Sequence, residues 1–132
     1  MKLSEEERNL LVGLQMEKSH RFLKQADEMC RQKYWDIASN RYYYACFHAV
    51  QALLIKNELV AHTHSGLLTQ FGLHFVKPGK IESRFGAFLS RMEQIREKGD
   101  YNCIYSITED EIETIVAPTK ELIKRIEELL AE

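Results

Sequence analysis

An arginine and a histidine interrupt the most apolar stretch of this 132-residue sequence. Most side chains between Asn40 and Leu54 are aliphatic or aromatic, and Arg41 and His48 stand among them seven positions apart. Seven residues span about two turns of an α-helix, so both side chains would project from one face of a helix. An arginine can hold a phosphate through two parallel N–H groups, and a histidine can move a proton near neutral pH. We therefore predict an anion or phosphate site on this face.

A structural role is the alternative for the same two residues. An arginine near a helix start often caps or pairs locally, and a histidine among apolar residues is often a hydrogen-bonded core residue. Charged side chains are seldom buried unless they are paired or used. Between Tyr42 and Ile55 the strongly polar side chains are His48 and Gln51 alone, and this scarcity favours the functional interpretation.

Three consecutive tyrosines, Tyr42 to Tyr44, follow Arg41, and aromatic rings can stack on the bases of single-stranded nucleic acids. Consecutive residues of a helix point in different directions, so at most two of the three can flank the Arg41/His48 face. Tyr44 lies closest to that face and is the candidate substrate-binding aromatic. We expect Tyr43 and Phe47 to point away from it into the core.

Length and composition indicate a single globular domain over residues 1–132, with 45% hydrophobic and 29% charged residues. The formal net charge of −2 argues against a broadly basic surface that coats nucleic acid, so any such contact would be local. The acidic N-terminus does not fit a signal peptide and no apolar run approaches a membrane span, so we expect a cytoplasmic protein with no membrane contact.

Neither a metal site nor a cofactor site is predicted. The three cysteines, Cys30, Cys46 and Cys103, are widely spaced and contain no CxxC pair, which indicates reduced, packed thiols. His62 and His64 stand two apart in an expected loop at a helix start, where solvent-exposed rings are the commoner outcome. The chain also lacks an HExxH motif, a glycine-rich phosphate loop and a dinucleotide fingerprint.

Helical periodicity and capping signals predict five helices. The first runs from about Ser4, which opens a capping box with Glu7, to about Gln32 along apolar positions that include Leu14 and Phe22. The second runs from about Tyr34 to Glu58. A short helix, capped by Thr63, ends before Pro78-Gly79.

The last two helices complete the expected fold. The fourth runs from Ile81 to Lys98, with Gly99 as its C-terminal cap and residues 100–106 as a loop. The fifth opens with the capping box of Thr108 and Glu111, and Pro118 predicts a kink near Thr114 to Pro118 or two abutting helices. The predicted fold is all-α, an antiparallel up-and-down bundle of four long helices plus one short helix. Because the second helix is apolar around its circumference, we expect its own chain to cover one face and a second copy the other.

Motifs in order along the chain resemble the HEPN superfamily (higher eukaryote and prokaryote nucleotide-binding domain), in particular its small stand-alone prokaryotic members. The matching residues are the run from Asn40 to Ala49, Ala52-Leu53-Leu54, His64-Ser65-Gly66, Phe71, Phe75-Val76-Lys77, and Arg96 followed by Asp100-Tyr101.

The resemblance implies a function for the Arg41/His48 pair, whose six intervening residues match an Arg-x(4–6)-His motif. It implies a metal-independent endoribonuclease of toxin–antitoxin or defence type, in which Arg41 holds phosphate and His48 is the acid/base. The expected product is a 2′,3′-cyclic phosphate, and two sites would face each other across a homodimer. Asn40, Arg96, Asp100 and Tyr101 are carried over as substrate-binding candidates. For Arg96 and Asp100 we expect first a structural role, as an ion pair that holds the loop in place, and second a role in binding substrate.

Two departures from the motif keep other functions open. Tyr42 follows the arginine where active members often carry a small polar residue, and Ala49 and Val50 occupy places where some members carry a modifiable tyrosine. One alternative is a catalytically silent HEPN module that binds a nucleotide or a partner, typically a minimal nucleotidyltransferase. A purely structural helical adaptor is the other.

Overall fold

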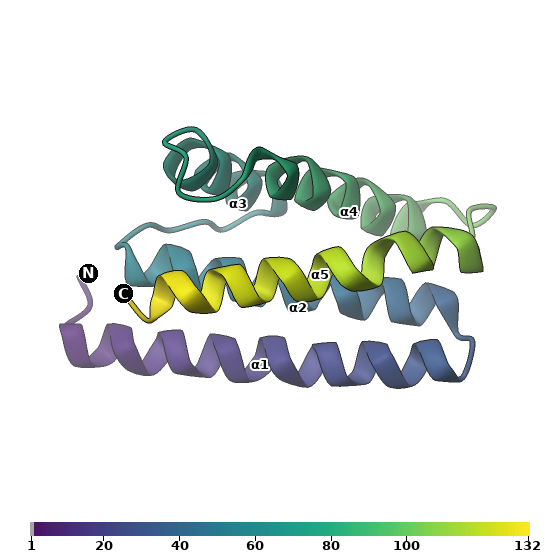
Figure 1. Ribbon diagram of the computed structural model, residues 1–132, viewed down its shortest axis with the longest axis horizontal. Helices are drawn as coiled ribbons and strands as arrows, with labels where there is room; N and C mark the ends of the chain where they lie inside the picture. The colour runs from purple at the N-terminus through teal and green to yellow at the C-terminus, as the bar shows by residue number, and fades with distance from the viewer. Residues whose placement is uncertain (1) are drawn as a thin grey trace.

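The computed structural model describes residues 2–132, which form helices joined by short loops. The elements are α1 (Glu5–Arg31), α2 (Trp35–Lys56), α3 (His64–Phe71), a single π-helical turn η1 (Gly72–Val76), α4 (Ser83–Tyr101) and α5 (Glu109–Leu130). The four long helices alternate in direction along the length of the molecule, and α3 lies beside one end of α4 (Figure 1). This arrangement confirms the all-α fold of four long helices and one short helix.

Side-chain caps begin three of the helices where the sequence predicts. The amide N–H of Glu7 donates to the hydroxyl of Ser4 at 3.1 Å, and the carboxylate of Glu7 accepts from the Ser4 amide at 2.8 Å. Thr108 and Glu111 form the same reciprocal pair at the start of α5. Thr63 caps α3 by accepting from the amide of Gly66 at 2.9 Å. These contacts satisfy backbone N–H groups that a helix start leaves without partners.

Helix α2 is the centre of the bundle. It packs against α1, α3, α4 and α5, and its buried side chains are Ala38, Ser39, Tyr42, Tyr43, Ala45, Cys46, His48, Ala49, Val50, Ala52, Leu53 and Leu54. One stripe of the helix is only partly buried and includes Asn40, Tyr44, Phe47, Gln51 and Ile55. The chain therefore covers most of α2 with its own helices, and cover of the remaining stripe by a second copy stays a prediction.

Helix α4 is longer than predicted at its C-terminal end. Gly99 lies inside the last turn and does not cap it, and Asp100 and Tyr101 belong to the helix. Arg96 donates to the carboxylate of Asp100 at 2.6 Å, an (i, i+4) pair that supports this last turn. The predicted loop is therefore shorter, and the Arg96–Asp100 pair lies within the helix and does not pin a loop.

Helix α5 is one continuous helix with Pro118 inside it, so the expectation of two abutting helices is wrong. A proline removes one backbone hydrogen bond and crowds the preceding turn. The buried side of α5 compensates through Ile112, Ile115, Leu122, Ile123 and Ile126, which pack into the shared core. Burial of this nearly ideal apolar stripe outweighs the local cost of the proline.

One further expectation about burial is wrong, because Cys103, predicted to be a packed thiol, is exposed. Phe47 packs against the core but is only partly buried. Leu14, one of the periodic apolar positions of α1, is 49% exposed. Within residues 2–132 no helix has the length and apolar character needed to cross a membrane.

Candidate functional site

Arg41 and His48 converge on the ring of Phe22, which α1 presents to the middle of α2. The guanidinium carbon of Arg41 lies 5.0 Å from the centre of the Phe22 ring, and the imidazole of His48 lies 5.4 Å from it. The two side chains thus share one face of α2, as their spacing predicts. Arg41 is half-buried, and its one side-chain hydrogen bond in the described chain is a long 3.4 Å contact to the amide oxygen of Asn40.

A hydrogen bond from α1 determines which ring nitrogen of His48 carries the proton. Its Nδ1 atom lies 2.8 Å from the side-chain oxygen of Gln15. An amide oxygen can only accept, so the bond places the proton on Nδ1 and leaves a lone pair on Nε2. The side chain is 9% exposed, and burial lowers the pKa of His48 to about 4, with further lowering by the charges of Lys18 and Arg21. At neutral pH the ring is a neutral base whose free nitrogen is Nε2.

Two aromatic rings separate His48 from a second histidine. Phe47 lies 5.2 Å from the imidazole of His48 and 5.1 Å from that of His64, measured between ring centres. Tyr44 contacts the same two histidines at 6.4 and 5.9 Å. Tyr44 therefore lies beside the predicted face, as expected, and Phe47 joins it there, where a core position was predicted.

His64 belongs to a polar network that connects α2, α3 and α4. The hydroxyl of Tyr43 lies 2.6 Å from Nδ1 of His64, and Glu93 lies 3.5 Å from the same nitrogen. Arg96 donates two bonds to Glu93, at 2.6 and 3.2 Å, and its guanidinium carbon lies 5.7 Å from the centre of the Tyr43 ring. His64 is thus only about one-third exposed, and the predicted solvent-exposed ring is wrong because Tyr43 draws it inward.

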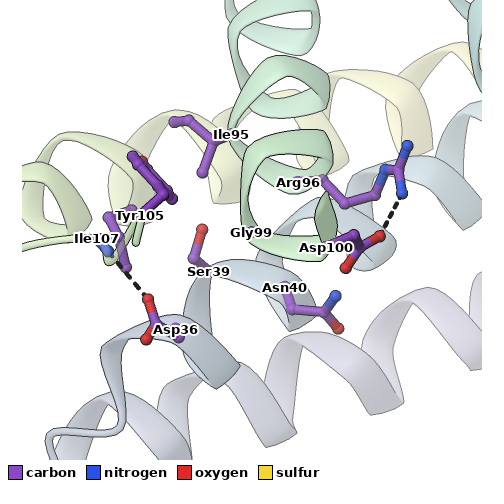
Figure 2. Close-up of a pocket in the computed structure, with 9 residues that line it drawn as sticks. All are labelled: Asp36, Ser39, Asn40, Ile95, Arg96, Gly99, Asp100, Tyr105 and Ile107. Carbon is purple, nitrogen blue, oxygen red and sulfur yellow. Dashed lines mark hydrogen bonds and ion pairs between the residues drawn. The ribbon is translucent and has the colours of Figure 1, made fainter. Parts of the chain in front are cut away.

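A small cavity adjoins Arg41 through Asn40 (Figure 2). It has a volume of about 150 Å³ and lies between the first half of α2, the end of α4 and the loop before α5. Its lining residues are Asp36, Ser39, Asn40, Ile95, Arg96, Gly99, Asp100, Tyr105 and Ile107. Three of the predicted substrate-binding residues, Asn40, Arg96 and Asp100, therefore meet at one cavity.

Tyr101 does not join them. It is 82% exposed, and Tyr105 occupies the aromatic position of the cavity lining. Two carboxylates, Asp36 and Asp100, face this cavity, and Asp36 accepts from the Ile107 amide at 2.9 Å. The lining is thus acceptor-rich and suits a ligand that carries N–H donors better than a phosphate.

The residues of α1 that complete the site were missed in the sequence. Gln15, Lys18 and Phe22 lie at spacings of three and four, and so share one face of α1. The sequence analysis lists Phe22 among the periodic apolar positions of the first helix and assigns no role to Gln15 or Lys18. Their spacing could have indicated a site, because Gln15, Lys18 and Phe22 share one face of α1 and that face packs against the part of α2 that carries Arg41.

Metal ligands do not gather at this site. In the part of the chain that the structure describes, no group of three or more His, Cys, Asp or Glu side chains is placed to hold a metal ion.

Comparison with known proteins decides the family. The model of the HEPN domain matches residues 13–129, which include every residue of the site described above. The chain belongs to the HEPN domain family. A relative from Thermotoga maritima, named "UPF0332 protein", is 37% identical over 93 residues that cover 70% of each chain.

Two other relatives carry a functional name. A protein of Methanocaldococcus jannaschii named "Putative toxin" is 34% identical over 110 residues, which cover 83% of this chain and 81% of the relative. A second protein of that organism with the same name is 27% identical over 101 residues, 76% of this chain and 69% of the relative. The HEPN assignment made from the motifs is thus confirmed.

Proposed function

We propose that this HEPN protein is a metal-independent endoribonuclease of toxin–antitoxin or defence type that works as a homodimer. The observation that carries the proposal is the convergence of Arg41 and His48 on Phe22. The arginine has no carboxylate within 4 Å among residues 2–132, and the histidine has a free Nε2. An unpaired, half-buried arginine beside a neutral histidine supplies an anion binder and a base at one place.

The proposed reaction assigns each group one task. Arg41 holds the scissile phosphate and stabilises the charge that develops on it. Nε2 of His48 takes the proton from the 2′-hydroxyl, whose oxygen then attacks phosphorus while the bond to the 5′-oxygen breaks. The proton taken up by His48 is returned to the 5′-oxygen. The products are a 2′,3′-cyclic phosphate and a 5′-hydroxyl end.

The names of the relatives from M. jannaschii support a toxin role. The Asn40 cavity supports a nucleotide ligand, because it lies next to Arg41 and offers oxygen acceptors to the N–H groups of a base.

One observation favours a second candidate function. His48 is 9% exposed and burial lowers its pKa to about 4, which makes it a weak base at neutral pH. The alternative is a catalytically silent HEPN module that binds a nucleotide or a partner, such as a minimal nucleotidyltransferase, through Arg41.

Cleavage of labelled single-stranded and structured RNAs in EDTA separates the two functions. We expect the wild-type dimer to cut RNA, His48→Ala to lower the rate by roughly 10²–10⁴-fold with RNA binding nearly intact, and Arg41→Ala to weaken both. His62→Ala, which removes an exposed histidine, is the matched control and should cut at the wild-type rate. Each variant must first retain the helical content and oligomeric state of the wild type. A folded wild-type protein that leaves every RNA uncut would support the binding module.

A further inference from the structure

Helix α1 places two cations beside the Arg41/His48 pair. The ammonium of Lys18 lies 5.9 Å from the centre of the same Phe22 ring that Arg41 approaches from α2. Arg21 follows Lys18 by three positions, so the two are neighbours on the surface of α1. Both side chains are exposed. Two cations from two helices thus lie over one aromatic ring, and a third follows on the same surface of α1.

These cations lack the partners that most other arginines of the chain have. Arg8, Arg31, Arg84, Arg96 and Arg125 each lie within 4 Å of a carboxylate. Within residues 2–132, Lys18, Arg21 and Arg41 have no such contact.

The nearest carboxylates in sequence do not compensate these charges. Asp27, farther along α1, accepts from Tyr42 at 2.6 Å and pairs with Lys120 at 3.2 Å. Glu17 makes no ion pair with a described residue. The three cations on this face therefore make no ion pair within the described chain, although the chain as a whole carries a formal charge of −2.

We propose that Lys18 and Arg21 form a second phosphate subsite beside Arg41, so that the site takes the backbone of an RNA strand rather than a mononucleotide. One phosphate lies at Arg41, and a neighbouring phosphate lies over α1. Asn40, which accepts from Arg41, also lines the cavity that carries Asp36 and Asp100 (Figure 2). The two carboxylates make this cavity a poorer place for a second phosphate than the cations of α1. The proposed subsite therefore directs the backbone across α1 and a base toward the cavity.

Two further features agree with this subsite. Burial and then the charges of Lys18 and Arg21 lower the pKa of His48, so both cations act on the catalytic candidate through space. An anion bound at the subsite would weaken that effect and raise the pKa of His48, making it a better base when substrate is present. The subsite deepens the proposed function and rests on it for the role of His48.

Binding of an RNA that cannot be cleaved tests the subsite independently of catalysis. The probe is a fluorescent ten-nucleotide RNA with 2′-O-methyl groups throughout, which lacks the attacking hydroxyl, and adenosine 5′-monophosphate is the short ligand. We expect Lys18→Gln and Arg21→Gln each to weaken binding of the decamer by roughly three- to tenfold and to reduce the slope of log affinity against log salt by about 0.7. Both should leave binding of the mononucleotide unchanged.

Lys124→Gln is the matched control, because Lys124 is an exposed lysine of α5 without an ion pair among the described residues. It should bind the decamer like the wild type. A Lys18→Gln/Arg21→Gln double variant with wild-type affinity and salt slope would overturn the subsite, as would a wild-type protein that does not bind the decamer. The wild-type protein could leave cleavable RNA uncut while the double variant loses binding of the decamer. That result would support the subsite and contradict the nuclease function.

Discussion

The Nδ1 atom of His48 lies 2.8 Å from the side-chain oxygen of Gln15, so a residue of α1 sets the tautomer of a histidine on α2. The bond also holds the imidazole against Phe22, where Arg41 lies on the same ring. His48 therefore depends on Gln15 for the position of its proton. A base on α2 is useful only when its proton is kept on the nitrogen that faces away from the substrate.

Replacement of Gln15 should change the titration of His48. In Gln15→Glu the new carboxylate favours the imidazolium, so the pKa of His48 should rise from about 4 toward its ordinary value. In Gln15→Leu the Nδ1–H loses its acceptor, and the tautomer should become mixed. Nitrogen-15 NMR of the imidazole against pH measures both effects. Gln25→Glu, at an exposed position of α1, is the control and should leave His48 unchanged. Unaltered titration in both Gln15 variants would contradict the bond.

The buried neutral state of His48 should make stability depend on pH. Its folded pKa of about 4 lies below the ordinary value of 6.5, so the unfolded chain binds more protons between these two values. The contribution is therefore fully present above pH 6.5 and is lost as the pH falls toward 4. We expect the free energy of unfolding to fall by roughly 1–3 kcal/mol over that window because of this residue.

Urea unfolding at several pH values, compared with His48→Gln, isolates this contribution. Glutamine keeps an N–H donor for Gln15 but cannot titrate, so the variant should lack this part of the pH slope. Equal slopes for the two proteins between pH 6.5 and 4 would contradict the assignment.

The sequence predicted the helices more completely than the site. Capping boxes and apolar periodicity located the starts of α1 and α5, because these signals are local. The end of α4 was missed because glycine is a common helix stop, whereas here the Arg96–Asp100 pair carries the helix past Gly99. Local propensity cannot register such a pair until the helix is already formed.

Tertiary contacts explain what was missed at the site. Arg41 and His48 were found because both lie on one helix, at a fixed spacing. Gln15 and Lys18 act on His48 from another helix, and the packing of α1 on α2 brings them together. His64 likewise looked like a loop residue until Tyr43 reached it across the bundle. No periodicity within one element carries that information.

The Arg96–Glu93 pair should matter far more for stability than an exposed pair on the same helix. The side chains of Arg96 and Glu93 are 9% and 14% exposed, and they are joined by two hydrogen bonds. Arg96→Ala would leave Glu93 without its partner and disturb the bond between Tyr43 and His64, at a cost of about 2–4 kcal/mol.

Arg84 of α4 provides the comparison. It pairs with Glu121 at 2.8 Å, but the two side chains are 60% and 50% exposed. Arg84→Ala should therefore cost less than about 1 kcal/mol. Urea unfolding of both variants at pH 7 measures the difference. Equal losses in the free energy of unfolding would contradict a buried ion pair between Arg96 and Glu93.

The exposed leucines of α1 predict where two copies would meet. Leu10 and Leu14 are 62% and 49% exposed, and they lie one turn apart on one face of the helix. Gln15 and Lys18 follow within the next turn, so a two-fold contact through the leucines would bring two Arg41/His48 sites close together. Leu10→Glu/Leu14→Glu should therefore convert the proposed dimer to a monomer, because it places four carboxylates at the shared face. Light scattering measures the mass in solution.

Leu73→Glu is the control for this interface, because it alters a leucine of η1 that is 50% exposed, and it should remain a dimer. A wild-type monomer would contradict the dimer, and a dimeric double variant would move its interface elsewhere.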